Sequence, residues 1–522
     1  MKLTKTTLIC LLVLAQTISC AQPGGLDNTF GNNGIVVTDF GFNIERSDGM
    51  TIQNDGKILL VGRADNGANN DLILVRYNSD GTLDASFDGD GITSVDLGGD
   101  EFGTSVITSP DGKIYVAGYR NESPNRDFLI YKFNADGSVD MTFGTNGRVD
   151  IDFGGTDDVA NNIMLTSAAV VVTGQSKNGA NNDFAAVRYL QSDGTPDNTF
   201  GALGKVTFDI VDSDACEASM LQESGKLTLF GYVSVAGNRD FAMVRYNEDG
   251  SLDNSFGSAG AKVTDINGGS DEGHSITHQP DGKIVAAGID LSVNSGIGHL
   301  VVVRHNEDGS LDGSFGTGGK VSEAIGLREF QSTSLVAMQA DGKILIAGTS
   351  NVLGETDEMT LVRLNSDGSF DNTFGNDGIV ITDIPGGSNL TKSIALQIDG
   401  KIVIGGYAFP DGSNSGDLAM CRYLSGTELG ILDFSVEDNS MLVYPNPVQE
   451  TTVLEYTLST SETISIDLYD VSGRLVQSLV QSEKRTKGPQ KETLALDSYL
   501  PAGTYILTLS TGAGSSSVRI TK

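Results

Sequence analysis

Short apolar runs separated by turn residues recur along most of the chain. Near the start such runs cover Ile35–Phe40, about Met50–Gln53, Lys57–Gly62 and Leu72–Tyr77. Asn54-Asp55-Gly56 separates two of them, and Asp and Gly tolerate the positive φ of a tight hairpin turn. The last run is apolar at consecutive positions, which indicates a strand covered on both faces. The pattern therefore predicts an all-β chain of stacked sheets.

This four-strand pattern repeats seven times, at intervals of 56 to 59 residues. An Asp-x-x-Phe core marks each repeat: Asp27 and Phe30, Asp84 and Phe87, Asp140 and Phe143, Asp197 and Phe200, Asp253 and Phe256, Asp312 and Phe315, Asp371 and Phe374. An Asp-Gly-Lys turn, as at Asp55-Gly56-Lys57, accompanies five of the cores, with a Ser-Gly-Lys variant in the fourth unit and none in the third, and a strand that ends in a basic residue, as at Arg76, accompanies all seven. Four strands per repeat are typical of a propeller blade, whereas a rung of a β-helix needs far fewer residues. Residues 26–426 are therefore predicted to form a seven-bladed β-propeller, with an open solenoid of β-sheets as the alternative.

The repeat also resembles a known family. The motifs Leu-Asp-x-Thr/Ser-Phe-Gly-x-x-Gly, Asp-Gly-Lys-Ile and Arg-Tyr-Asn, taken together, are similar to those of the delta-60 repeat family, and the resemblance covers all seven units. It implies an extracellular or surface bacterial protein with a propeller fold. It implies no known activity.

The repeated residues are expected to be structural, because a ligand site in a ring usually occurs once. The Phe of each core is predicted to be an anchor buried between blades, and the Asp to accept backbone N–H groups in a turn. Arg76 lies eight residues before Asp84, and Arg304 lies eight before Asp312. We therefore expect a repeated ion pair. A ring of seven cation sites is the functional alternative.

The N-terminus has the pattern of an export signal. A lysine-containing start is followed by the apolar run Leu8–Ala15 and by small residues. This order predicts a signal peptide over residues 1–21, cleaved between Ala21 and Gln22. A lipoprotein acylated at Cys20 is the alternative. No later segment reaches the ~18 consecutive apolar residues of a membrane-spanning helix, so no transmembrane span is predicted.

The repeats stop at about residue 426, and the rest of the chain has a different character. An acidic linker over residues 427–440 precedes alternating strands in residues 441–522, which predict a small Ig-like β-sandwich. This segment resembles the C-terminal sorting domain of the type IX secretion system of Bacteroidetes. The residues that carry the resemblance include Tyr444, Pro445, Asn446, Pro447, Gly473, Gly503 and Tyr505. The resemblance implies export by the type IX machinery, followed by release or attachment at the outer-membrane surface; an ordinary Ig-like accessory module is the alternative.

The charge of the chain is strongly negative and unevenly placed. There are 34 basic and 68 acidic residues, a net charge of −34, but residues 441–522 carry 7 basic and 8 acidic residues. A protein this acidic is a poor partner for nucleic acid or anionic lipid. The propeller is expected to have a solvated acidic shell and no cofactor, and divalent cation binding is the functional alternative.

Residue patterns typical of catalysis are sparse. All four histidines lie in the fifth unit, at positions His274, His278, His299 and His305. His278 and His305 replace core residues of other repeats, and His299 replaces a repeated Asp. Neither a zinc site nor a catalytic residue is predicted. The many carboxylates single out no glycosidase pair. Cys216 and Cys421 occupy small or apolar repeat positions in different units and are expected to be buried and unpaired.

The loops before the fourth strand of each repeat, such as Asn66–Asn70, differ most between units. Loops on a rigid scaffold commonly carry specificity, and the absence of Trp lowers the expectation of a sugar-stacking platform. We interpret the protein as a secreted or cell-surface, non-enzymatic scaffold that binds an unknown extracellular protein or glycan. The alternatives are an extracellular enzyme that acts on polysaccharide through carboxylates at the propeller mouth, and a structural matrix or adhesion protein.

Overall fold

The computed structural model describes residues 22–426 apart from 123–124, 155–156, 223, 292–297, 326–327, 353–354 and 410–414. It also describes residues 441–522 apart from 445–447, 449–450, 459–460, 471–474, 498–499, 501–502 and 512–513. The elements assigned in these residues are all β-strands. Within the described residues, no helix is long and apolar enough to cross a membrane.

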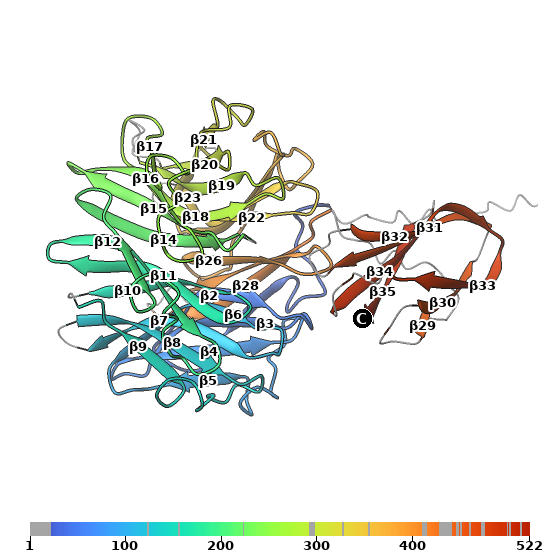
Figure 1. The fold of residues 1–522 in the computed structure, drawn as a ribbon, viewed down its shortest axis with the longest axis horizontal. Coiled ribbons are helices and arrows are strands. Elements are labelled where there is room, and N and C mark those ends of the chain that lie inside the picture. The colour runs from blue at the N-terminus through green and yellow to red at the C-terminus, as the bar shows by residue number, and fades with distance from the viewer. Residues whose placement is uncertain are drawn as a thin grey trace, which may run out of the picture.

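Seven antiparallel sheets of four strands form the propeller, as predicted (Figure 1). Blade 1 contains β2 (Ile44–Ile52), β3 (Ile58–Asp65), β4 (Asn70–Tyr77) and β5 (Ile92–Val95). Blade 2 contains β6 (Asp100–Thr108), β7 (Ile114–Glu122), β8 (Asn125–Phe133) and β9 (Arg148–Ile151), and blade 3 contains β10 (Asp158–Leu165), β11 (Ala169–Asn178), β12 (Asn181–Leu190) and β13 (Lys205–Phe208). Blade 4 contains β14 (Ser213–Leu221), β15 (Leu227–Val235), β16 (Asn238–Tyr246) and β17 (Ala261–Thr264), and blade 5 contains β18 (Asp271–His278), β19 (Ile284–Asp290), β20 (His299–His305) and β21 (Lys320–Glu323). Blade 6 contains β22 (Arg328–Met338), β23 (Ile344–Val352), β24 (Glu358–Leu364) and β25 (Ile379–Thr382).

The N-terminal strand closes the ring. Blade 7 contains β26 (Asn389–Leu396), β27 (Ile402–Ala408) and β28 (Asp417–Tyr423), and its fourth strand is β1 (Ile35–Thr38). Ile35 of β1 is paired with Cys421 of β28. The first strands of neighbouring blades pack against one another all the way round, including β26 against β2, so these strands are innermost. The repeat seen in the sequence is therefore out of phase with the blade, because the first apolar run of the chain completes the last sheet.

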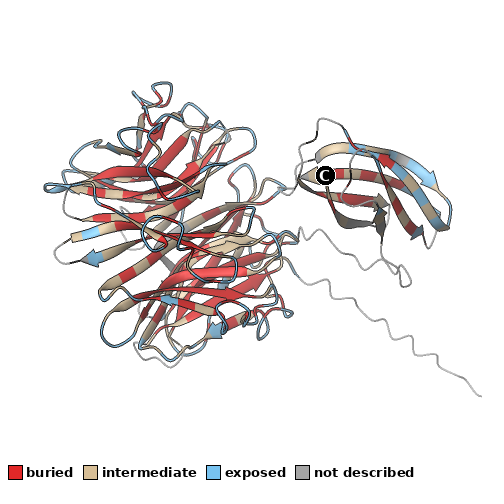
Figure 2. Ribbon diagram, turned by 60° about the horizontal axis from the view of Figure 1, so that its bottom comes forward, coloured by how far each residue is buried: buried red, intermediate tan, exposed pale blue. Residues whose placement is uncertain are grey.

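The core lies between blades, where each sheet is covered on both faces. Leu72 and Leu74 of β4 pack in one cluster with Val116 of blade 2, whereas Ile73 of β4 packs with Met420 of blade 7. Burial of an aliphatic side chain of this size contributes about 1.5–3 kcal/mol. Figure 2 shows the buried residues concentrated along the strands and the exposed ones in the connections. The consecutive apolar positions of β4 thus correspond to the predicted two-sided burial.

A β-bulge interrupts each innermost strand at the same place in its pairing with the second strand. In six blades one residue is skipped at the bulge, and these residues are Asp48, Thr104, Asn161, Glu217, His274 and Lys392. A bulge re-aims a side chain and bends the strand. Thr104 Oγ1 donates to the Ala160 carbonyl at 2.9 Å, and Asn161 Nδ2 donates to the Cys216 carbonyl, which bonds neighbouring innermost strands.

The C-terminal strands form two further sheets. One consists of β29 (Leu442–Tyr444), β30 (Thr451–Leu458) and β33 (Gly488–Ala495). The other has the order β32 (Leu475–Arg485), β31 (Glu462–Asp470), β34 (Thr504–Thr511) and β35 (Gly514–Thr521). Leu454 of the first sheet and Ile466 of the second belong to one buried cluster, which agrees with the predicted Ig-like sandwich.

Candidate functional site

The two ends of the ring carry different kinds of connection. We call the motif end the one with the turns between first and second strands, such as Gln53–Lys57, and between third and fourth strands, such as Asn78–Asp90. We call the loop end the one with the turns between second and third strands, such as Asn66–Asn69, and the passages to the next blade, such as Asp96–Gly99. Antiparallel pairing fixes this division, because successive turns alternate between the two ends of a sheet.

At the motif end, the Asp of each Asp-x-x-Phe core joins several parts of one blade. Asp84 Oδ2 lies 2.7 Å from Arg76 Nε and 2.9 Å from Lys57 Nζ, and Asp84 Oδ1 accepts bonds from the main chain and hydroxyl of Ser86. Burial alone would raise the pKa of Asp84, but the Ser86 bonds and the two cations hold that pKa well below its usual range. The same ion pair with a basic residue occurs in the other blades: Lys132–Asp140, Arg188–Asp197, Arg245–Asp253, Arg304–Asp312, Arg363–Asp371 and Arg422–Asp27. The predicted repeated ion pair is therefore present in all seven blades.

The basic residue of this pair also binds the next blade. Arg76 donates through Nη1 to the Ala135 carbonyl, and its guanidinium lies 4.5 Å from the centre of the Phe87 ring. Phe87 is buried, and Gly137 of the next blade packs on its ring. The motif-end residues thus connect strand to strand and blade to blade, and both oxygens of each core Asp, as in Asp84, are occupied by protein donors.

The histidines and cysteines of the propeller fall mostly where expected. His305 is fully buried and its Nε2 lies 3.2 Å from Thr264 Oγ1, as the Tyr77 hydroxyl does from Thr38 at 2.9 Å. His278 is wrong as a predicted core position, because it lies exposed at the very end of β18. Cys216 and Cys421 are buried and free.

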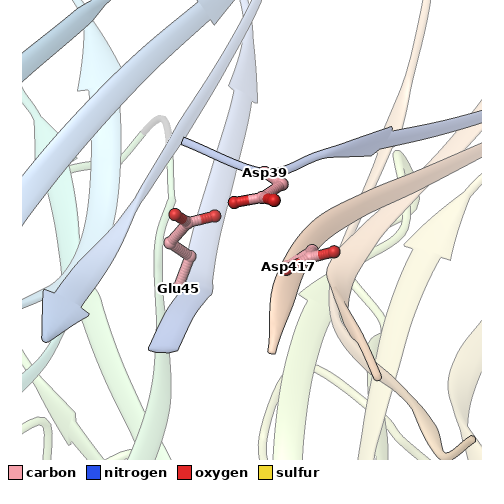
Figure 3. Close-up of side chains that lie close together, drawn as sticks. All are labelled: Asp39, Glu45 and Asp417. Atoms are coloured by element: carbon pink, nitrogen blue, oxygen red, sulfur yellow. The ribbon is translucent and has the colours of Figure 1, made fainter. Parts of the chain in front are cut away.

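At the loop end, three carboxylates meet at several blade junctions. One lies at the start of the third strand of a blade (the strand acid), one directly follows the fourth strand (the turn acid), and one lies at the start of the next innermost strand (the inner acid). In each triad, one oxygen from every member lies within 4.8 Å of the others. The triads, in the order strand, turn and inner acid, are Asp417, Asp39 and Glu45; Asp71, Asp96 and Glu101; Asp127, Asp152 and Asp158; Asp240, Asp265 and Asp271. Figure 3 shows the first of them, with the carboxylate of Glu45 directed towards that of Asp39.

The inner acid is buried in every triad, and in the triad of Glu101 the strand acid Asp71 is buried too. Glu45 is 1% exposed and Asp271 is 0% exposed. Asp271 Oδ2 accepts the Ile266 N–H at 2.9 Å, whereas its Oδ1 has no hydrogen-bond partner in the described structure. Burial, together with the neighbouring acids, raises the pKa of Asp271 to about 7 and that of Asp158 to about 6. The turn acids are exposed, so each triad is open to solvent on one side.

These triads were not predicted from the sequence, although it contains a signal for them. A turn acid precedes the inner acid by five or six residues in five repeats, as at Asp96 and Glu101 or Asp265 and Asp271. The strand acid lies about 25 residues earlier in the chain, as Asp240 does. The three acids come together because one blade ends just before the turn acid and the next blade begins at the inner acid. The repeat in the sequence did not show where one blade ends and the next begins.

A second polar group lies near the ring axis. Burial raises the pKa of Glu217, an effect that His274 and Lys392 oppose, and burial lowers the pKa of His274. These three side chains come from the bulges of blades 4, 5 and 7. His274 Nε2 also lies 3.6 Å from Glu272 Oε2.

The predicted export residues are only partly described. Residues 1–21, which include Ala21, and the linker 427–440 lie outside the described residues, as do Pro445, Asn446, Pro447 and Gly473. Gln22 is exposed and its Nε2 donates to the Gly375 carbonyl at 2.8 Å. Tyr444 is exposed and its hydroxyl donates to Glu455, whereas Tyr505, two residues after Gly503, is buried.

Two family models match the chain. The model described as "Domain of unknown function (DUF5122) beta-propeller" matches residues 53–87, 109–143, 170–200, 222–256, 279–315, 339–374 and 397–426. The model described as "Secretion system C-terminal sorting domain" matches residues 442–522. No curated protein matches the sequence.

Several solved structures are similar over much of their length. A protein of unknown function from Dyadobacter fermentans DSM 18053 is 13% identical, with a TM-score of 0.40, over 75% of this chain and 98% of its own. The polysaccharide lyase Uly1 is 10% identical, with a TM-score of 0.42, over 79% of this chain and 94% of its own. The GH93 α-L-arabinofuranosidase of Fusarium graminearum, solved with arabinobiose, is 9% identical, with a TM-score of 0.36, over 77% of this chain and 97% of its own. Likenesses this distant carry no argument about activity.

Proposed function

Because the chain belongs to the DUF5122 β-propeller proteins and ends in a type IX sorting domain, we propose that it is an exported, non-enzymatic binding scaffold whose loop end contacts the ligand. The sorting domain directs type IX secretion to the cell surface or the extracellular space. The ligand class that we propose is an extracellular glycan or protein.

One observation carries the proposal: the repeats diverge at the loop end and agree at the motif end. The turn at the loop end is Asn66–Asn69 in blade 1, Gly179-Ala180 in blade 3 and Ala236-Gly237 in blade 4. At the other end, the Asp-x-x-Phe connection keeps its residues and bonds in all seven blades, and the Asp-Gly-Lys turn is kept in five, with Ser224-Gly225-Lys226 in blade 4 and Ser167-Ala168-Ala169 in blade 3. A rigid frame that varies its loops on one face is typical of a binding protein.

Binding of the mature chain to an array of extracellular glycans and outer-membrane proteins tests the proposal. We expect saturable binding without turnover, and reduced binding when the Asn66–Asn69 loop is replaced by the two-residue Gly179-Ala180 turn of blade 3. A matched control variant changes Asp136, an exposed motif-end residue, to Asn. If no member of the array binds, or if both variants bind like the wild type, the proposal fails.

A second candidate is an enzyme that acts on extracellular polysaccharide. The polar group of Glu217, His274 and Lys392 on the innermost strands favours this candidate. Burial raises the pKa of Glu217, and a carboxyl group with a raised pKa can act as a general acid. Release of reducing sugar from polysaccharides by the wild type, abolished in Glu217→Gln, would support this candidate over the scaffold. Binding without sugar release would support the scaffold.

A further inference from the structure

Two arginines of blade 1 lie directly opposite each other near the loop end. Arg46 of β2, the residue after the inner acid Glu45, is the pairing partner of Arg63 of β3. Like charges at directly opposite positions of a sheet are destabilising. The same two positions hold one acid or none, and no base, in two other blades: Val159 and Gln175 in blade 3, Glu272 and Ile289 in blade 5. The blade fold therefore does not require a cation at either position, yet blade 1 has two.

The protein neutralises only one of these two arginines. Arg63 Nη1 lies 3.3 Å from Asp48 Oδ2. Arg46 makes no ion pair among the described residues, and its Nε is buried there without a hydrogen-bond partner. Its guanidinium lies 5.0 Å from the centre of the Tyr407 ring of blade 7. A ring face attracts the cation but leaves the N–H groups at the guanidinium edge without acceptors. Arg46 thus has a charge and donors that no described group takes up.

The same kind of contact continues into blade 2. Arg63 lies 5.0 Å from the centre of the Phe102 ring, and Phe102 stacks on Tyr119 with ring centroids 4.7 Å apart. Arg126, which is exposed, lies 5.7 Å from the Tyr119 ring and makes no ion pair within the described part of the chain. We call the side chains that are joined in this way across blades 7, 1 and 2 the arginine row: Tyr407, Arg46, Arg63, Phe102, Tyr119 and Arg126.

A similar contact in blade 4 is closed by an acid. Arg239 lies 5.0 Å from the centre of the Tyr232 ring, but its Nη1 binds Glu272 of blade 5. The arginine row differs because Arg46 and Arg126 stay without an acid among the described residues. Unlike the ion pairs of the motif end, the row is confined to one side of the ring, which is expected of a ligand site rather than of a repeated structural contact.

We propose that the arginine row binds an acidic glycan, whose carboxylate or sulfate groups pair with Arg46 and Arg126. The planar guanidinium presents its N–H groups as a fork that matches the oxygens of such groups. A chain with a net charge of −34 repels anions at long range, so the two free guanidinium groups supply the local attraction that this ligand needs. The inference rests on the proposed function, because it names the ligand class of the loop end.

A glycan fits this surface better than an acidic protein or peptide. Arg46 is only partly exposed and lies on an innermost strand, so a flat protein surface that rests on the exposed turns, such as Asn66–Asn69, would not reach it. A single chain of sugars is narrow enough to enter, and its hydroxyls can bond to the Tyr119 hydroxyl, which makes no hydrogen bond among the described residues. Asp48 and Asp100 lie near Tyr119. They disfavour a peptide that carries a charge at every residue more than a glycan in which hydroxyls separate the charges.

Binding of the mature chain to four soluble polymers tests the proposal, at about 150 mM NaCl to screen long-range charge. The polymers are polygalacturonate, which carries carboxylates, dextran sulfate, neutral dextran and poly-L-glutamate. We expect saturable binding of polygalacturonate or dextran sulfate, and weaker or no binding of the other two. Which of the two acidic glycans binds more tightly identifies the anionic group as carboxylate or sulfate.

Three arginine variants assign the binding to the row. Arg46→Met keeps the packing on Tyr407 but removes the charge, so we expect it to weaken binding at least about tenfold. Its melting temperature should stay the same or rise, because two opposed like charges are no longer present. Arg126→Met, at an exposed position, should also weaken binding without loss of stability. Arg239→Met is the matched control, because it removes the same charge at the loop end from an arginine that already has its acid, and its affinity should equal that of the wild type.

The proposal is overturned if neither acidic glycan binds, if poly-L-glutamate binds as tightly as the better of the two, or if Arg46→Met and Arg126→Met both bind like the wild type. A neutral glycan or a protein that binds the loop end in their place would reject this inference and leave the proposed function intact. Absence of any ligand, both here and on the array, would reject the two together.

Discussion

Arg422 Nε lies 2.9 Å from Asp27 Oδ2, although 395 residues separate the two in the sequence. In the other blades the corresponding pair is eight or nine residues apart, as for Arg363 and Asp371. Arg422 has no Asp at that distance downstream, because Gly430 and Ile431 occupy those places. The N-terminal segment supplies the missing Asp together with strand β1, so the ring is closed by the same contact that is local everywhere else.

The closing pair gives the first prediction. Asp27→Asn removes a buried charge that Arg422 and Lys401 share, and loss of one partner from such a group costs on the order of 3 kcal/mol. Hydrogen exchange followed by mass spectrometry should then show faster exchange of the amides in β1. Asp371→Asn is the control, because it removes the same pair within a covalently continuous blade and should leave β1 protected. Equal protection of β1 in both variants would show that the pair does not hold the strand.

The two cations that bind Asp312 should contribute unequally to stability. Arg304 is almost buried, binds the Ser366 carbonyl of the next blade and stacks on Phe315, whereas Lys283 is 31% exposed in its side chain. We expect Arg304→Met to lower the free energy of unfolding by about 3–5 kcal/mol and Lys283→Met by about 1 kcal/mol or less. Urea unfolding measures both. An Arg304→Met protein that is as stable as the wild type would contradict the assigned role of the motif end.

The contact between Phe87 and the turn of the next blade gives a third prediction. Gly137 has a φ of 95°, and a Cβ added there would lie 3.0 Å from the Phe87 ring. Gly89 has nearly the same φ, 94°, but a Cβ there would meet no atom within 4 Å. Gly89→Ala is therefore expected to cost about 1 kcal/mol from the backbone alone, and Gly137→Ala about 1–3 kcal/mol more from overpacking. Thermal unfolding of the two variants measures the difference in their stability, which is the contribution of packing. Equal losses of stability would argue against a tight contact between the blades.

The limits of sequence reasoning are visible in these same contacts. The Arg76–Asp84 pair could be predicted because both residues lie in one short connection that recurs. Closure by β1 could not, since the repeat is cyclic and any strand can be taken as its start. The acid triad around Asp271 could not be predicted for a related reason. Its three oxygens come together from two blades, and the sequence alone does not show that these acids are neighbours. The burial of His305 was foreseen from its Tyr equivalents, whereas the exposed end of β18 left His278 outside the core.

A pH dependence follows from His305. Burial, with the charges of Lys262 and Lys320, lowers the pKa of His305 from 6.5 to about 4. A group whose pKa is lower in the folded state contributes stability above its unfolded pKa and loses it as the pH falls through the folded value. Stability from this site should therefore be complete above about pH 6.5 and disappear towards pH 4, by on the order of 3 kcal/mol.

His305→Tyr tests this dependence, because Tyr77 at the equivalent position of blade 1 makes the same bond to a Thr. Urea midpoints of the two proteins should differ more at pH 4.5 than at pH 7.5, with the variant relatively more stable in acid. Comparison of the two cancels the titration of all other groups that they share. Parallel curves would contradict a buried neutral His305.

The central claim is that the loop end binds and the motif end holds the ring together, and blocking one end at a time tests it most directly. Cys216 and Cys421 are buried, so a single cysteine introduced at Ala180 (loop end) or Leu203 (motif end), both exposed, can be modified selectively with a bulky maleimide. The measurement is the affinity of each modified protein for the ligand found on the array. The account predicts that the adduct in Ala180→Cys weakens binding at least tenfold and that the adduct in Leu203→Cys leaves it unchanged; loss of binding with the Leu203→Cys adduct alone would contradict it.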